Sequence, residues 1–169
     1  NNIAIEYQSL NKFDKANVHF LKASKLNTKN YISNTLLFTN MGKNYLKKND
    51  FQNTYVYLNL AKKQQTTTEN LYTIAELHNA FAAYYLKTKQ INLALPYLQK
   101  AVATSEKIEY TFGLSETYFL YGLYYEQSNE IQLAIEYFTK AQQIANELSI
   151  LELQLDTNLH LATIYKNLQ

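Results

Sequence analysis

The sequence of 169 residues contains no cysteine and no arginine, and it has only three glycines and one proline. The lack of cysteine excludes disulfides and thiolate metal sites, although it does not decide the cellular compartment. All 16 basic residues are lysine, so the bidentate fork with which arginine grips phosphate and carboxylate groups is missing. Because an all-β fold with many tight turns needs more glycine and proline, these absences favour a helical protein.

Long hydrophobic runs are also missing. No apolar run approaches the roughly 18 residues of a membrane span and no signal peptide opens the chain, so we expect no membrane insertion. A hydrophobic fraction of 47% is nevertheless enough to bury a core, and the length fits one domain or a short array of repeats. Since the chain begins Asn-Asn rather than with Met, we expect it to be part of a larger protein.

Charge is small overall but unevenly spread. A net charge of +2 is too low for a generic nucleic-acid-binding protein, so we expect no nucleic acid partner. Residues 1–64 hold ten lysines against three acidic residues, a net charge of +7, whereas the remainder holds six lysines against eleven acidic residues, a net charge of −5. The basic N-terminal segment and the acidic remainder have either solvated faces of different composition or surfaces suited to different partners.

The residues that catalysis requires do not gather in the sequence. His19, His78 and His160 lie far apart, and without an HExxH motif or a close histidine pair the sequence predicts no metal site. The glycines are too scattered for a phosphate-binding loop. With no positioned base, nucleophile or metal, we expect a protein that is not an enzyme and needs no cofactor.

What the sequence has instead is a repeat of about 40 residues. The repeat places small and large side chains at fixed positions. In the unit that contains Tyr125 these positions hold Gly122, Ala134, Phe138 and Ala141, and 40 residues earlier the equivalent positions hold Ala82, Ala94, Leu98 and Ala101. Tyrosine recurs at positions 7, 45, 85, 125 and 165. Such self-similarity predicts an array of repeats in one domain, with a partial unit at 1–28, units at 29–68, 69–108 and 109–148, and a terminal helix at 149–169.

Each unit reads as two helices, because apolar residues recur at spacings of three and four in both halves. Short polar breaks at 47–50, 87–90 and 126–130 separate the two helices of a pair, and Asp50 and Asn129 are the predicted N-caps there. Gly122 and Ala134 are predicted to be small where the paired backbones approach. Phe138 is predicted to fill the space between neighbouring pairs.

The pattern Tyr118-x-x-Tyr121-Gly122-x-x-Tyr125, followed by Ala134-x-x-x-Phe138-x-x-Ala141, resembles the tetratricopeptide repeat. The resemblance implies an all-α fold in which antiparallel helix hairpins stack into a right-handed α-solenoid. The period is 40 rather than about 34 residues, so each helix is expected to be longer by roughly three residues. Long-period units of this kind are similar to those of bacterial sensor and regulator proteins.

By this resemblance, the first helices of successive units line a concave groove that binds peptides. The expected groove residues are Asn40, Lys43, Glu76, Asn79, Glu116, Phe119, Leu120, Leu123, Asp156, Leu159 and His160. Glu76, Glu116 and Asp156 recur at 40-residue intervals and are predicted to form a column of carboxylates. The leucines and the phenylalanine beside them would form an apolar floor, and the combination suits a cationic, partly apolar peptide.

The leading hypothesis from the sequence is therefore a non-catalytic protein- or peptide-binding module, belonging to a bacterial signalling or regulatory protein of either the cytoplasm or the periplasm. The alternative is a structural scaffold that forms homo-oligomers, in which the basic N-terminal half of one copy docks on the acidic C-terminal half of another. Self-association that weakens as salt concentration rises would favour this alternative.

Overall fold

A computed structural model of the chain describes residues 2–26, 34–65 and 70–168, and over these ranges the chain forms helices and no strand. In chain order the helices are α1 (Asn2–Ser9), α2 (Phe13–Leu26), α3 (Asn34–Lys47), α4 (Phe51–Gln64), α5 (Leu71–Lys87), α6 (Ile91–Lys107), α7 (Thr111–Gln127), α8 (Ile131–Glu147) and α9 (Leu151–Asn167). None of the helices in these ranges combines the length and the apolar character that crossing a bilayer requires.

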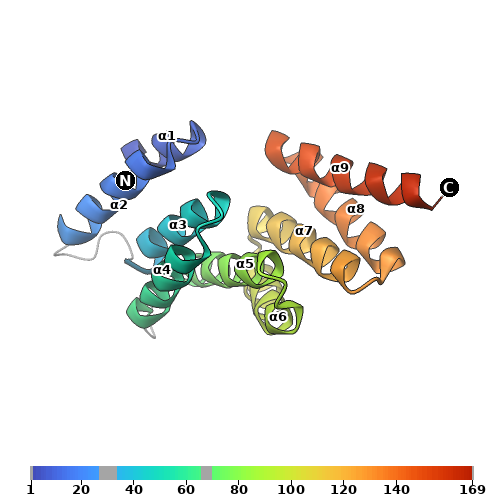
Figure 1. Cartoon of the computed structure of the whole chain (residues 1–169), viewed down its shortest axis with the longest axis horizontal. Helices are drawn as coiled ribbons and strands as arrows, with labels where there is room; N and C mark the ends of the chain where they lie inside the picture. Colours follow the sequence, from blue (N-terminus) through green and yellow to red (C-terminus); the bar gives the residue numbers. More distant parts are fainter. Residues whose placement is uncertain (1, 27–33, 66–69, 169) are drawn as a thin grey trace.

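The helices pack as consecutive hairpins that stack into a solenoid, as the sequence predicted. The pairs α3/α4, α5/α6 and α7/α8 make the most extensive contacts, and each pair then packs against the next. The first helices α3, α5 and α7 also contact one another in succession. Figure 1 shows the resulting arc, with α1 and α2 at one end and α9 at the other.

The repeated small residues make room for a large side chain from the other helix of the same hairpin. A Cβ atom added to Gly122 would lie only 2.4 Å from Cδ1 of Phe138, and one added to Gly42 would lie 2.6 Å from Cδ2 of Leu58. Phe138 also reaches the next helix, where the ring of His160 stacks 4.9 Å from its own. Phe138 thus fills the space between pairs, as predicted. Its ring also explains why position 122 is a glycine, since a side chain there would collide with it.

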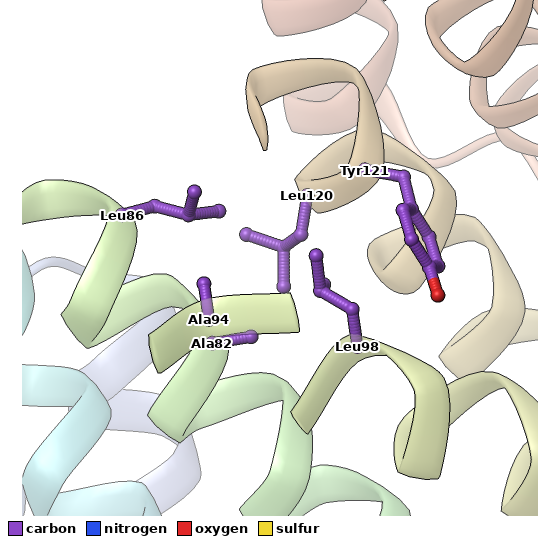
Figure 2. Packing of buried hydrophobic residues seen from close by; sticks show 6 residues of the cluster. All are labelled: Ala82, Leu86, Ala94, Leu98, Leu120 and Tyr121. Carbon is purple, nitrogen blue, oxygen red and sulfur yellow. The ribbon is translucent and has the colours of Figure 1, made fainter. Parts of the chain in front are cut away.

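In the hairpin α5/α6 the corresponding residues are Ala82 and Leu98, both fully buried. Figure 2 shows them in one core cluster with Leu86 and Ala94, into which α7 inserts Leu120 and Tyr121. Burial of this kind contributes roughly 25 cal/mol for each Å² of apolar surface removed from water. The core therefore runs along the array from hairpin to hairpin.

Turns of one type join the long helices. The helices α5 to α9 have 17 residues each, and three residues separate each from the next. One residue in each turn has positive φ, and the residue after it donates its backbone N–H to the carbonyl five residues earlier, as in Glu130 N to Tyr125 O at 2.8 Å. This is the Schellman arrangement that ends many helices.

Of the two predicted N-caps, the structure confirms Asp50 and contradicts Asn129. Asp50 is the N-cap of α4, and its Oδ1 accepts from the backbone N–H of Asn53 at 3.1 Å. The prediction for Asn129 is wrong, because Glu130 occupies the N-cap position of α8. Asn129 instead has a φ of 61° and terminates α7, a conformation that asparagine tolerates better than most residues.

Candidate functional site

A cleft of about 260 Å³ lies on the inner side of the arc, between α3, α5, α7 and α9. Its apolar lining consists of Leu46, Ala83, Phe112, Phe119, Leu120, Ile150 and Leu153. Its polar lining consists of Lys43, Lys47, Asn79, Glu116, Glu152 and Asp156. Residues far apart in the sequence thus form one concave site, because the stacked hairpins curve toward one another.

Lys43 holds two of the predicted carboxylates together. Its Nζ lies 2.8 Å from Oε2 of Glu76 and 3.2 Å from Oε2 of Glu116. Glu76 is 4% exposed, and its Oε1 accepts a hydrogen bond of 2.9 Å from the hydroxyl of Tyr110. Three first helices, α3, α5 and α7, are therefore joined by one lysine and its two acidic partners.

Burial and charge act in opposite directions on this group. Burial disfavours the charge on Lys43, but Glu116 and Glu76 together raise its pKa above the usual lysine value. Burial likewise opposes the charge on Glu76, yet Lys43 and the hydrogen bonds that Glu76 accepts bring its pKa below the usual value. The pKa of Glu116 is raised, because burial and the neighbouring Glu76 outweigh the attraction of Lys43.

A second ion pair crosses the cleft near its mouth. Nζ of Lys47, at the end of α3, lies 2.7 Å from Oε1 of Glu152, in the first turn of α9. Both side chains are exposed to solvent. Asp156, one turn further along α9, makes no ion pair with any residue in the described ranges, and partial burial raises its pKa. The mouth of the cleft thus has two carboxylates that a ligand could bind. Asp156 has no ion-pair partner among the described residues, and the exposed partner of Glu152 is easily displaced.

Asn79 has a structural role as well as a place in the lining. Its Nδ2 donates to the backbone oxygen of Gly113 at 3.2 Å, and its Oδ1 accepts from the hydroxyl of Thr117 at 2.9 Å. Asn79 and Thr117 are both buried. These contacts fix α5 to α7 behind the cleft and leave Asn79 little freedom to bind a ligand.

The structure brings together some of the predicted groove residues and separates others. Those that line the cleft are Lys43, Asn79, Glu116, Phe119, Leu120 and Asp156. Those that do not line it are Asn40, Glu76, Leu123, Leu159 and His160. The predicted carboxylate column is present as a sequence pattern, but its members differ in environment. Glu76 is buried and Glu116 is half-buried, and both are paired with Lys43, whereas Asp156 is exposed.

The residues outside the lining have other neighbours. Glu76 is engaged by Lys43 and Tyr110, and Leu123 packs against the hydrophobic clusters on both sides of α7. His160 lies between Phe119 and Phe138, with Nδ1 2.9 Å from Oε2 of Glu126. Leu159 is 65% exposed and Asn40 is half-buried.

Sequence reasoning missed the residues at the ends of the helices. These are Leu46, Lys47, Phe112, Ile150, Glu152 and Leu153. The repeat pattern identifies equivalent positions on successive helices, but it does not show which helix ends converge as the array curves. The charge of Glu152, one turn before Asp156, was the available signal.

No group of three His, Asp or Glu side chains in the described part of the chain is placed to hold a metal ion. The side chains that line the cleft offer a ligand apolar contact, hydrogen bonding and ion pairing.

Comparison with known proteins identifies the class of protein. Residues 73–147, which span most of α5 and all of α6, α7 and α8, match the model of the tetratricopeptide repeat family. The resemblance to this family seen in the sequence is therefore confirmed over these residues. The repeats and the fold support a protein-interaction module, since stacked helical repeats present extended concave binding surfaces.

Two solved structures share the fold. One is described as MamA RS-1 ArsTM double mutant, with 18% identity, a TM-score of 0.56 and coverage of 99% of this chain and 93% of that chain. The other is MamA 41-end from Desulfovibrio magneticus RS-1, with 18% identity, a TM-score of 0.57 and coverage of 98% of this chain and 90% of that chain. No curated protein sequence matches the chain significantly.

Proposed function

We propose that the cleft binds a peptide segment of a partner protein, with an apolar side chain on its floor and a cationic side chain at its mouth. The observation that carries this proposal is the composition of the lining, in which seven apolar residues lie beside three carboxylates and two lysines. Apolar contact supplies affinity in such a groove, and the charges set orientation and choice of partner.

The size of the cleft favours a side chain as its occupant. A volume of about 260 Å³ is below the roughly 300–1,000 Å³ of sites that enclose a whole drug-sized molecule. It is large enough for one bulky apolar side chain. We therefore expect one anchor residue to enter the cleft while the rest of the peptide lies along the inner surface of α5 and α7.

The position of the cation follows from the existing ion pairs. Lys43 already offsets Glu76 and Glu116 on one side of the cleft. On the other side, Glu152 holds only the exposed Lys47, and Asp156 has no ion-pair partner among the described residues. A lysine or arginine of the peptide would therefore bind between Glu152 and Asp156 and compete with Lys47.

A module of this kind would serve as the sensor or interaction segment of a bacterial signalling or regulatory protein. The resemblance of the 40-residue period to that of such proteins supports this role. Peptide binding at the cleft can be measured without knowing what the module controls.

The test is selection from a random peptide library, carried out in parallel on the wild type and on the double variant Glu152→Gln, Asp156→Asn. We expect the wild type to select peptides that pair a large apolar residue with a basic one, and the double variant to lose the basic residue. Glu136→Gln is the matched control, since Glu136 is an exposed acid on α8 away from the cleft. If all three proteins select the same peptides, or none selects any, the proposal is wrong.

The self-assembling scaffold is the second candidate, supported by the opposite charges of the two halves of the chain. Part of that charge is used within one copy, because Lys43 and Lys47 of the basic half pair with Glu116 and Glu152 of the acidic half. Light scattering at low and high salt distinguishes the candidates. Self-association that salt weakens would support the scaffold.

A further inference from the structure

The charges of the cleft do not balance within the described residues. Its lining carries two lysines and three carboxylates, and a fourth carboxylate, that of Glu76, lies outside the lining in contact with Lys43. Lys87 does not alter this count, because it lies outside the lining and its Nζ donates to the backbone oxygen of Leu46 at 3.0 Å. Two positive charges therefore face four negative ones when all four carboxylates are ionised.

One of the two surplus negative charges lies at the mouth of the cleft. Glu152 and Asp156 share a single lysine there, since Nζ of Lys47 pairs with Glu152 and Asp156 has no ion pair among the described residues. This is the position at which the proposed peptide places its cation. One cation at the mouth leaves the second surplus charge uncompensated.

The second surplus charge lies on Glu116. Although Lys43 is paired with two carboxylates, its single charge balances only one of them. Its Nζ is 2.8 Å from Oε2 of Glu76, but 3.3 and 3.2 Å from the two oxygens of Glu116. Glu76 also accepts the hydrogen bond from Tyr110, whereas Glu116 accepts from Lys43 alone among the described residues. Glu76 is therefore the better satisfied of the two carboxylates.

The pKa values of the two carboxyl groups agree with this assignment. Burial raises the pKa of Glu116, and the charges of Lys43 and Lys47 do not return it to its usual value. Burial also opposes the charge on Glu76, but Lys43 and the hydrogen bonds bring that pKa below its usual value. The folded chain thus stabilises the charge of Glu76 and leaves that of Glu116 to be stabilised by a ligand.

Glu116 is within reach of a ligand in the cleft. Its side chain is 28% exposed and forms part of the lining. Phe119 and Leu120 follow it on the same side of α7, at spacings of three and four residues, and both belong to the apolar lining. The apolar residues of the cleft are thus accompanied by carboxylates from two helices, Glu116 of α7 and the Glu152 and Asp156 pair of α9.

We infer that the segment bound in the cleft is dibasic, with one basic side chain between Glu152 and Asp156, a second at Glu116 and an apolar side chain on the floor. This inference rests on the peptide-binding function proposed above and specifies the class of its ligand. Water screens the half-buried Glu116 less than the exposed carboxylates at the mouth, so it discriminates more strongly between a charged and a neutral side chain. Glu116 is therefore the residue that distinguishes dibasic from monobasic segments.

The test compares the peptides that different variants select from one random hexapeptide library. The peptides are N-acetylated, so that their cations come from side chains alone. We expect the wild type to select two basic residues together with a large apolar one. The double variant Glu152→Gln, Asp156→Asn should lose one of the basic residues, and Glu116→Gln should lose the other. Glu136→Gln, on the surface of α8, is the control and should select like the wild type.

Affinities of single peptides then assign each basic residue to its carboxylate. A peptide selected by the wild type is resynthesised with each basic residue in turn replaced by norleucine, which has no charge. Replacing the basic residue that Glu116→Gln ceases to select should weaken binding to the wild type by roughly tenfold, and binding to Glu116→Gln by less than about threefold.

Glu116→Gln is expected to fold, because its amide oxygen can still accept from Lys43 and the substitution removes a charge that burial disfavours. The norleucine peptides also test the inference on the wild type alone. If either of the two basic residues can be replaced without weakening binding to the wild type, the ligand is not dibasic in the sense inferred.

Two further results would overturn the inference and leave the proposed function standing. The first is selection by the wild type of peptides with a single basic residue. The second is selection by Glu116→Gln of the same two basic residues as the wild type, which would place the second cation elsewhere. If the wild type selects no peptide, or only peptides without a basic residue, the inference and the proposed function are both wrong.

Discussion

Lys47 and Glu152 are 105 positions apart in the sequence, yet their side chains form an ion pair of 2.7 Å across the cleft. The pair joins the third helix to the ninth and crosses the mouth of the cleft in which we propose that a peptide binds. Two long exposed side chains gain little from such a contact, since water competes for both charges.

We therefore expect Glu152→Gln to lower the free energy of unfolding by less than about 1 kcal/mol. Urea denaturation of the wild type, Glu152→Gln, Lys47→Met and the double variant gives the coupling energy. A coupling of several kcal/mol would mean that the pair holds the array in its curved form. A small coupling would leave Glu152 available for a ligand.

Removing the charge of Lys43 should lower the free energy of unfolding by more than Glu152→Gln does, because Glu76 beside Lys43 is buried. Lys43→Met leaves both Glu76 and Glu116 without a cation, and we expect a loss of about 3 kcal/mol at pH 7. Lys140→Met is the matched control, since Lys140 pairs with Glu136 on the surface of α8, and it should cost less than about 1 kcal/mol.

The pH dependence of the Lys43→Met variant gives a second check. Without the cation, burial raises the pKa of Glu76 in the folded state above its unfolded value. A carboxyl group with a raised folded pKa becomes less destabilising as pH falls through that pKa. The deficit of the variant relative to the wild type should therefore shrink between pH 7 and pH 5 in urea denaturation. A deficit that stays constant would mean that the variant loses packing rather than charge compensation.

The contact between Gly122 and Phe138 leads to a prediction of compensation. Gly122→Ala places a methyl group within 2.4 Å of the phenylalanine ring, and we expect a cost of about 1–3 kcal/mol despite the better helix propensity of alanine. Adding Phe138→Leu recreates the pair Ala82 and Leu98 of the preceding hairpin. The double variant should therefore be destabilised by less than the sum of the two single variants, as measured by thermal and urea denaturation. Strict additivity would show that the two positions do not pack as described.

The sequence predicted part of the packing between Gly122 and Phe138 and part of the lining of the cleft. The reasons for both successes and both omissions are related. A 40-residue period identifies which residues are equivalent, and because small and large side chains alternate at fixed offsets it also indicates which ones pack inside a hairpin. The convergence of Lys47 with Glu152 depends on the curvature of the array, which accumulates over several hairpins. No local pattern contains that information. Lys43 was among the predicted groove residues and lines the cleft, but its two ion pairs with Glu76 and Glu116 involve three different helices and were not foreseen.

The turns offer a route to a more stable chain. Lys89 and Glu109 have φ values of 60° and 53°, in the left-handed region where a side chain with a Cβ costs roughly 1–2 kcal/mol. Lys89→Gly and Glu109→Gly should each raise the free energy of unfolding by about 0.5–1 kcal/mol after the greater chain entropy of glycine is subtracted. Ser128→Gly is the control, because Ser128 has a φ of −84° and its replacement should destabilise the chain. Equal effects at all three positions in urea denaturation would contradict this explanation.

The last prediction concerns the dependence of stability on pH and rests on His78. This histidine is partly buried, and its Nδ1 has no hydrogen-bond partner among the described residues. Burial, together with the positive charges of Lys100 and Lys62, lowers the pKa of His78 to about 4. The unfolded chain, in which histidine titrates near its usual value of about 6.5, therefore binds a proton that the folded chain does not bind between these two pH values. Stability should fall as pH is lowered through this window, by about 2 kcal/mol between pH 7 and pH 5 for this group. His78→Phe keeps a ring beside Tyr97 and removes the titration, so the variant should be less sensitive to acid than the wild type when both are unfolded with urea at the two pH values. An unchanged sensitivity would mean that His78 is protonated in the folded chain.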